Sequence, residues 1–152
     1  MRNFWILALS IFCFACNGNY VYEEKVEILE GKWQYGNLIT YEFNIEDTEA
    51  KYNLYLDVTH NDQFTSQNFY TMIHTTYPSG REVDSQISIE LADKLGQWYG
   101  KCGGNECELR VVLQQQTFFK EKGLHKIIFE QYSRKEVLTG IKALAFSVEI
   151  VE

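Results

Sequence analysis

Residues 39–45 read Ile-Thr-Tyr-Glu-Phe-Asn-Ile, a segment in which large apolar side chains occupy every second position. Residues 52–59, Tyr-Asn-Leu-Tyr-Leu-Asp-Val-Thr, repeat this pattern after a short break. Because successive side chains of a β-strand point to opposite faces of the sheet, the alternation places one face against a core and the other in water. The two segments therefore predict amphipathic strands and set the fold class.

The same signal extends over most of the chain in both directions. A looser alternation precedes it at residues 20–28, and further strand-like runs follow, bounded by Gly, Asn, Asp or Pro turn residues. Residues 91–95 (LADKL) can form one short helical turn. The pattern predicts an all-β fold, a single antiparallel β-sandwich of jelly-roll-like type. The further runs are 68–76, 83–90, 108–116, 124–131 and 138–150.

Length and charge exclude several classes of protein. The chain has 152 residues, which favours one domain, and 45% hydrophobic residues, which is typical of a folded protein and not of a disordered one. Its formal net charge is −7, with 14 basic and 21 acidic residues. Because nucleic-acid binding requires clustered Lys and Arg to neutralise phosphates, we expect no nucleic-acid partner.

The first sixteen residues carry the pattern of an export signal. Residues 1–3 include one positive charge, and residues 4–15 (FWILALSIFCFA) form an apolar run. Twelve helical residues cover about 18 Å, which is too short for a hydrocarbon core of roughly 30 Å. The small residue Ala15 then precedes Cys16. This order resembles a bacterial lipoprotein signal, in which the cysteine thiol is acylated and becomes the mature N-terminus.

Two alternatives to acylation stay open, namely ordinary cleavage near Ala15 and an uncleaved anchor. Cys13 also stands three positions before Cys16, where such signals usually carry Leu or another aliphatic residue. On the lipoprotein interpretation the chain divides into a signal peptide at 1–15, a lipidated N-terminus with a short tether at 16–24, and the β-sandwich domain at 25–152. The partner implied by the acyl chains is a membrane.

Cys102 and Cys107 bracket the turn sequence Gly-Gly-Asn-Glu. Outside the cytosol two such cysteines are expected to form a disulfide. Free thiols and a metal site are the alternatives, but zinc needs three or four ligands and no His lies nearby in the sequence. We therefore predict a disulfide at the tip of a hairpin, and no metal.

Few residues point to chemistry. The sequence contains no His-Glu-x-x-His, no Gly-x-Ser-x-Gly, no phosphate-binding glycine loop and no dinucleotide fingerprint, so we predict no catalytic residues and no cofactor. The histidines at 60, 74 and 125 stand apart in the sequence. Exposed aromatic side chains on a β-sandwich can stack on sugar rings, although Trp and Tyr are more often core residues. The candidates for stacking are Trp33, Tyr35, Trp98 and Tyr99.

A set of short motifs in a fixed order resembles a known family. Residues 91–100 read Leu-Ala-Asp-x-x-Gly-x-Trp-x-Gly, followed by Gly-Leu-His-Lys at 123–126, Phe-Glu-Gln-Tyr-Ser-Arg at 129–134 and Leu-Thr-Gly-Ile at 138–141. Tyr-Asn-Leu-Tyr at 52–55 precedes them, and the lipoprotein signal stands in front. Together they resemble the GldH family, lipoproteins of the Bacteroidetes associated with gliding motility. The Cys102–Cys107 pair is not a hallmark of that family.

The resemblance implies a non-enzymatic envelope lipoprotein required for gliding motility, working beside the associated protein-secretion apparatus. Of the site residues it transfers only Cys16, as the lipid attachment position. Residues 17–19, Asn-Gly-Asn, lack the acidic run that resembles a surface-export signal, so we expect a lipid-anchored domain facing the periplasm from the cell membrane or the outer membrane. Glycan binding in the cell envelope is the alternative function, and an undetected hydrolase with a polar cleft is a further one.

Overall fold

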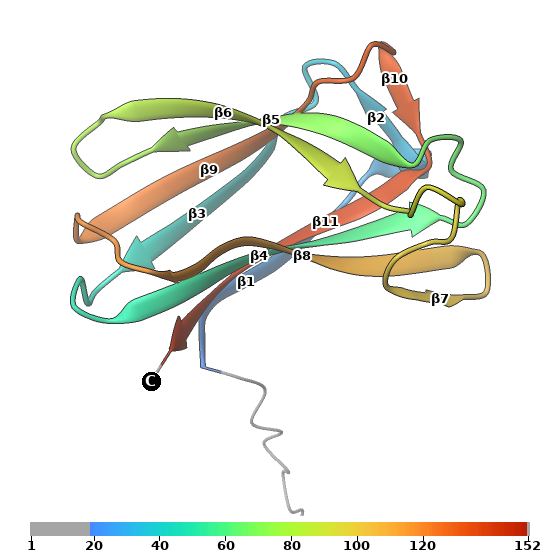
Figure 1. The fold of residues 1–152 in the computed structure, drawn as a ribbon. Coiled ribbons are helices and arrows are strands. Elements are labelled where there is room, and N and C mark those ends of the chain that lie inside the picture. The colour runs from blue at the N-terminus through green and yellow to red at the C-terminus, as the bar shows by residue number, and fades with distance from the viewer. Residues whose placement is uncertain (1–18, 152) are drawn as a thin grey trace, which may run out of the picture.

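The computed structural model describes residues 19–151, and it is an antiparallel β-sandwich (Figure 1). A five-stranded sheet in the order β1-β11-β4-β8-β7 packs face to face with a four-stranded sheet in the order β3-β9-β5-β6, and a small β10-β2 ribbon lies at one end. All strand pairs are antiparallel, so the predicted fold class is confirmed. The strands are β1 (Tyr20–Glu27), β2 (Lys32–Gln34), β3 (Ile39–Ile45), β4 (Lys51–Asn61), β5 (Asn68–Thr76), β6 (Glu82–Glu90), β7 (Lys101–Gly103), β8 (Glu106–Thr117), β9 (Gly123–Gln131), β10 (Val137–Thr139) and β11 (Ile141–Val151).

The core follows the alternation read from the sequence. Along β3 every second residue is buried, and β4 and β9 show the same pattern over most of their length. At the flank where β1 and β3 approach, aromatic rings fill the space between the sheets, with Tyr22 5.7 Å from Phe43 and Tyr41 5.5 Å from Phe146, measured between ring centroids. The buried Tyr41 hydroxyl donates to the carbonyl of Leu144 at 2.7 Å. This flank is therefore closed by apolar contact with its polar group satisfied.

The run predicted at 138–150 is two strands in different sheets, β10 and β11. Gly140 separates them, with a φ of +108°, and a Cβ at this position would lie 2.9 Å from Cδ2 of Phe64. The chain therefore turns sharply at a position where the backbone conformation and the lack of space for a Cβ both require glycine. The three-residue strands β2 and β7 were not predicted, because they are too short to show a periodic pattern.

Two further expectations differ from the structure. Residues 20–24, assigned to the tether, belong to β1, which pairs with β11, so the folded domain begins at least five residues earlier than predicted. The predicted helical turn at 91–95 is an isolated bridge at Ala92 followed by a turn in which the Asp93 carboxylate accepts from the backbone N–H groups of Leu95 and Gln97. A side chain that satisfies the backbone in this way favours a turn over a helix.

No helix within residues 19–151 is long and apolar enough to cross a bilayer. The helical segment that the structure describes is a single 3₁₀ turn at Leu29–Gly31. The predicted signal peptide and Cys16 lie outside the described residues.

Candidate functional site

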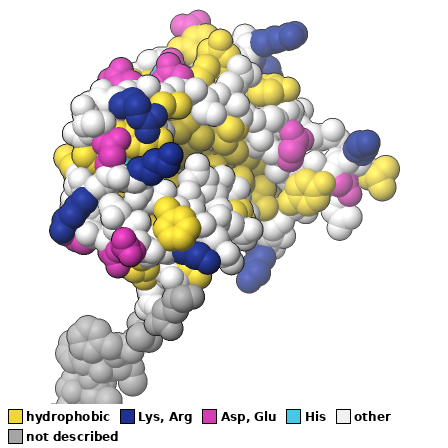
Figure 2. All heavy atoms as spheres, turned by 60° about the vertical axis from the view of Figure 1, so that its left-hand side comes forward, with side chains coloured by type: hydrophobic (Ala, Val, Ile, Leu, Met, Phe, Trp, Pro, Cys, Tyr) yellow, Lys and Arg dark blue, Asp and Glu magenta, His cyan; other side chains and the backbone are white. Residues whose placement is uncertain are grey.

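The flank between β6 and β8, opposite the closed β1–β3 flank, contains a groove between the two sheets. Its volume is ≈ 440 Å³, and both sheets contribute to its walls. Figure 2 shows hydrophobic side chains gathered in a hollow on this side of the molecule, with Lys and Arg side chains beside it. Here β6 and β8 are the outermost long strands of their sheets. Aromatic rings line this flank as well, but they leave the space between the two sheets open to solvent.

The wall from the four-stranded sheet is formed mainly by β6. Its residues alternate between the two faces, so that Val83, Ser85 and Ile87 line the groove while Asp84 and Gln86 do not. Val83 is 40% exposed and Ile87 is half-buried. Ile73 of the neighbouring strand β5 continues the same apolar surface. These inward-facing residues therefore contact solvent although their pattern is that of a core.

The opposite wall comes from β8 and the loop that follows it. Leu113 points into the groove from β8, and Phe118 and Phe119 extend the wall beyond the end of the strand. Phe118 is 53% exposed, whereas Phe119 packs with its ring centroid 5.8 Å from that of Phe43. The loop thus supplies one aromatic ring to the core and leaves another at the rim of the groove.

His125 of β9 lies in the floor and is 1% exposed. Its ring stacks on Phe43 with centroids 5.5 Å apart, and Nδ1 lies 3.1 Å from the carbonyl of Gly123. Nε2 is buried without a hydrogen-bond partner. Burial lowers the pKa of His125, so the imidazole is neutral at pH 7. The neutral ring therefore adds no charge to the groove, and its Nε2 is a polar atom in the floor.

The charged residues lining the groove are Arg81 and Lys120, both basic. The guanidinium carbon of Arg81 lies 3.7 Å from the centroid of the Tyr77 ring, a cation–π contact that fixes it beside the mouth. Glu121 follows Lys120, but its carboxylate accepts the backbone N–H of Ser79 at 2.8 Å and is engaged with the β5–β6 hairpin. The charged side chains that line the groove are therefore basic on a chain whose net charge is −7, and Glu121 interacts electrostatically with Arg81 from beside them.

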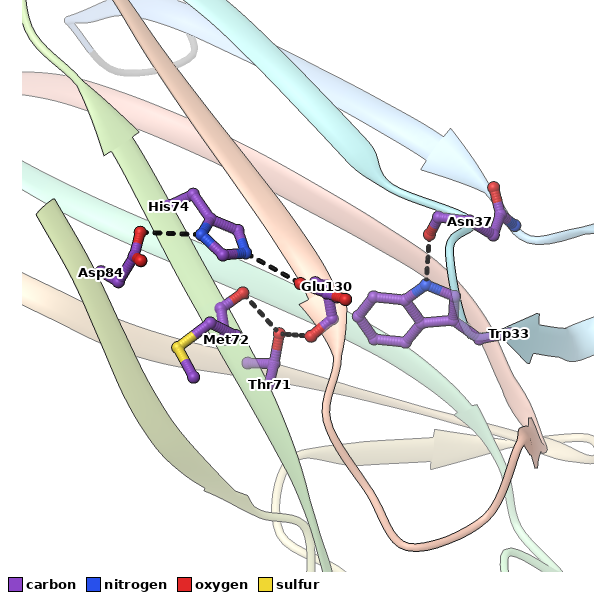
Figure 3. A network of polar contacts seen from close by, with 7 residues as sticks. All are labelled: Trp33, Asn37, Thr71, Met72, His74, Asp84 and Glu130. Atoms are coloured by element: carbon purple, nitrogen blue, oxygen red, sulfur yellow. Dashed lines mark hydrogen bonds and ion pairs between the residues drawn. The ribbon is translucent and has the colours of Figure 1, made fainter. Parts of the chain in front are cut away.

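A second polar cluster lies on the outer face of the four-stranded sheet (Figure 3). His74 of β5 is placed between Asp84 of β6, 2.8 Å from Nδ1, and Glu130 of β9, 2.9 Å from Nε2. Its hydrogen bonds to Glu130 and Asp84 raise the pKa of His74. The imidazolium therefore joins three adjacent strands across their exposed face, which is a structural role in the sheet.

The predicted stacking residues do not form one surface. Trp33 is fully buried, donates from Nε1 to the carbonyl of Asn37 at 2.8 Å and packs against Phe69, so it presents no face to a sugar (Figure 3). Trp98 is half-buried and donates from Nε1 to the carbonyl of Asp62 at 3.0 Å. Tyr35 and Tyr99 are 47% and 44% exposed, but they follow β2 and precede β7, respectively. The prediction that Trp33 stacks on a sugar is wrong, because its whole side chain is buried in the core.

Cys102 and Cys107 are joined by a disulfide at the β7–β8 hairpin, with their Cα atoms 4.0 Å apart. Cys107 is fully buried and lies opposite His60 of β4. Residues 19–151 contain no group of three or more His, Cys, Asp or Glu side chains that could hold a metal ion.

The motif at residues 91–100 builds a loop that packs on the sandwich. Leu91 and Ala92 are buried, and the N–H of Tyr99 donates to the carbonyl of Leu91 at 2.8 Å. Gly100 has a φ of +80°, and a Cβ there would lie 2.2 Å from the carbonyl oxygen of Glu108. The loop therefore lies directly on the backbone of β8. The motif was visible in the sequence but the groove was not, because the local signal of the groove is only Val83, Ile87 and Ile89 alternating with polar residues, with Ser85 interrupting the apolar series.

Comparisons with known proteins agree with the motifs. The family model described as "GldH lipoprotein" matches residues 20–148. A "Gliding motility lipoprotein GldH homolog" of Christiangramia forsetii is 24% identical, covering 93% of this chain and 96% of the relative. The "Gliding motility lipoprotein GldH" of Flavobacterium johnsoniae is also 24% identical, with 98% and 97% covered.

Solved structures resemble the chain only loosely. A family GH115 4-O-methyl-α-glucuronidase has a TM-score of 0.44 and 11% identity over 90% of this chain and 18% of that one. A GH51 α-L-arabinofuranosidase has a TM-score of 0.38 and 11% identity over 77% and 18%. These likenesses to small parts of much longer chains support no statement about function.

Proposed function

Because the chain belongs to the GldH lipoprotein family, we propose that it is a membrane-anchored envelope lipoprotein that acts in gliding motility without catalysing a reaction. The observation that carries the proposal is the extent of the match. The family model spans residues 20–148, and the strands of the sandwich span residues 20–151. Both curated relatives are named for gliding motility and align over nearly their whole length. What the family shares is therefore this entire domain.

The anchor in this proposal is an acylated Cys16. Four residue steps separate Cys16 from Tyr20, the first residue of β1, and the chain can span at most about 14 Å over them. The sandwich is thus held within a short distance of the bilayer, with no long linker to carry it away. Confinement of this kind raises the effective concentration of the domain for other envelope proteins, including those of the associated secretion machinery. We place the domain on the periplasmic side.

The non-catalytic part of the proposal rests on the composition of the groove. A catalytic site needs polar groups that converge on a reacting atom, for example a nucleophile beside a base. The groove walls combine apolar residues with the uncharged polar residues Thr75, Ser85, Gln114 and Thr117, and the buried His125 in the floor has no carboxylate or nucleophile as a hydrogen-bond partner. Surfaces of this kind bind partners or ligands.

Deletion of the gene in the organism that encodes it tests the proposal. We expect deletion to stop colony spreading and single-cell gliding, and we expect the wild-type gene to restore both. Secretion of a known exported protein is measured in the same strains to show whether the defect includes the secretion machinery. Normal gliding of deletion cells would contradict the proposal. Growth rate serves as the control for a general envelope defect.

Labelling with an alkyne fatty acid tests the anchor separately. The wild-type protein is expected to incorporate the label and to sediment with membranes, whereas a Cys16→Ala variant incorporates none. Label on the Cys16→Ala variant would place the acyl chain elsewhere. Cys13 is the matched control, because Cys13→Ala leaves the mature protein unchanged if cleavage precedes Cys16.

A further inference from the structure

The groove between β6 and β8 has the volume and the lining residues of a ligand site. We propose that it binds the hydrocarbon chain of a single-chain anionic amphiphile, a long-chain carboxylate, whose charged end lies at Arg81 and Lys120. The inference concerns what the domain binds, and it does not require that the protein acts in motility.

The walls leave apolar surface in contact with water. Val83 and Phe118 are 40% and 53% exposed, and Ile73, Ile87 and Leu113 are half-buried, although all five face the groove. Removing this surface from water is favourable, and continuous apolar surface of this kind marks binding sites. The volume of ≈ 440 Å³ lies in the usual range of sites for small molecules.

The shape suits an extended chain. From Arg81 at the mouth to Ile87, six residue steps along the β5–β6 hairpin and β6 cover about 20 Å. Inward-facing residues follow this length on one wall, while Leu113 and Phe118 face them from the other. This length fits a hydrocarbon chain that lies parallel to β6, against apolar side chains with uncharged polar residues between them.

The charge at the mouth selects the head group. Arg81 and Lys120 are the charged residues that line the groove, and they supply guanidinium and ammonium donors to an anion. Two acids adjoin them in the sequence: Glu82 is an exposed residue at the start of β6, and Glu121 is held by the backbone N–H of Ser79 and also interacts electrostatically with Arg81. A carboxylate that enters the groove therefore meets two lining cations, Arg81 and Lys120, and competes with Glu121 for Arg81.

A peptide strand fits the same groove less well. An added strand must pair with a regular row of backbone groups on a sheet edge. The edge strand β6 carries Glu82, Asp84 and Glu90, charges of the kind that block pairing between strands. The register of β8 against β4 shifts twice near Leu54, and Gln116 has a φ of +48°, so the backbone of β8 is irregular beside the groove. A hydrocarbon chain needs no backbone hydrogen bonds and is unaffected by either feature.

Photo-cross-linking of the full-length protein tests the proposal. The acylated protein is reconstituted into phosphatidylcholine vesicles, mixed with a palmitic acid analogue that carries a diazirine, irradiated and digested. We expect the label on peptides that contain β6 and residues 113–119. The matching methyl ester should label these peptides about three- to tenfold less, because each surface ion pair is worth up to about fivefold in binding. Label distributed evenly over the domain would overturn the proposal, since it would reflect contact with the bilayer alone.

Two valines, one on β6 and one on β8, provide a matched pair of test and control variants. Val83→Glu places a carboxylate inside the groove and should reduce the labelling of β6 at least tenfold. Val112→Glu makes the same change on the outer face of β8, where Val112 is 47% exposed, and should leave labelling unchanged. Ser85→Trp, which fills the groove without adding charge, should act like Val83→Glu. Circular dichroism verifies that each variant is folded.

Two outcomes would overturn the assignment. One is labelling of β6 that Val83→Glu and Ser85→Trp leave intact. The other is stronger competition by an alternating apolar hexapeptide than by palmitate at equal concentration, which would assign the groove to a strand. Neither outcome affects the motility proposal, because gliding of the deletion strain is measured independently.

Discussion

Gly100 provides a quantitative test of the fold around the family motif, because its close approach to β8 can be separated from its backbone conformation. Gly96 and Gly100 have φ values of +82° and +80°. A Cβ at Gly96 would meet nothing within 4 Å, whereas a Cβ at Gly100 would lie 2.2 Å from the carbonyl oxygen of Glu108. Real Cβ atoms do not approach other atoms this closely, and the clashing atom belongs to a strand backbone.

Replacement of either glycine by Ala introduces strain of about 1–2 kcal/mol from the positive φ. Both variants also gain about 0.4–1 kcal/mol, because Ala restricts the unfolded chain more than Gly does. Only Gly100→Ala must also displace β8, which costs about 1–3 kcal/mol by analogy with overpacked cores. Gly100→Ala should therefore be less stable than Gly96→Ala by this last amount.

Urea unfolding followed by circular dichroism measures the free energies of both variants, and thermal unfolding provides a second measurement. At roughly 3–5 °C for each kcal/mol, the midpoint of Gly100→Ala should lie about 3–15 °C below that of Gly96→Ala. Equal loss of stability in the two variants would refute the reasoning, since it would mean that the loop does not lie on β8. In that case the motif would need an explanation other than packing.

Three further predictions concern polar and covalent contacts. The pKa of His74 is raised by its hydrogen bonds to Glu130 and Asp84, so the stabilising contribution of His74 is complete below about pH 6.5 and is lost as the pH rises through its folded-state pKa. The difference in unfolding free energy between wild type and His74→Gln should therefore shrink from about pH 6 to pH 9. A difference that grows over this range would contradict the prediction. Replacing both Cys102 and Cys107 by Ala removes a short loop closure and should cost about 2 kcal/mol in urea, while no change would mean that the oxidised hairpin adds nothing. Arg110 donates from Nε and one terminal nitrogen to both carboxylate oxygens of Asp57 at 2.7 Å, but the pair is half-exposed. Arg110→Lys should therefore lower the free energy of unfolding by no more than about 1 kcal/mol, and a loss of several kcal/mol would contradict this prediction.

Strands with a solvent-facing side were predictable from the sequence, and strands without a local pattern were not. Apolar and polar residues alternate so regularly over residues 39–45 that the strand and its buried face follow from periodicity alone. The run at 138–150 is also strand-like throughout, and nothing in its pattern shows that it crosses between sheets at Gly140. That break depends on Phe64, which is distant in the sequence and fills the space beside the glycine.

The candidate site was less predictable than the fold. The aromatic candidates for stacking were predictable only by residue type, and Trp33 is fully buried in the core. The groove depends instead on the spacing of two sheets at one flank, a property that no single segment carries. Val83 and Leu113 are ordinary alternating residues in the sequence. In the part of the chain that the structure describes, no strand pairs with the free edge of β6, and β7 pairs with β8 only at Glu106–Glu108, so both residues keep contact with solvent.

The claim that joins anchor, domain and motility is tested most directly by the gliding speed of single deletion cells that produce a Cys16→Ser variant. The account predicts that wild-type protein restores gliding, and that the variant, which folds but carries no acyl chain, leaves the cells immobile at equal protein abundance. Gliding at wild-type speed with the Cys16→Ser variant would contradict the account, because the domain would then act without its lipid anchor.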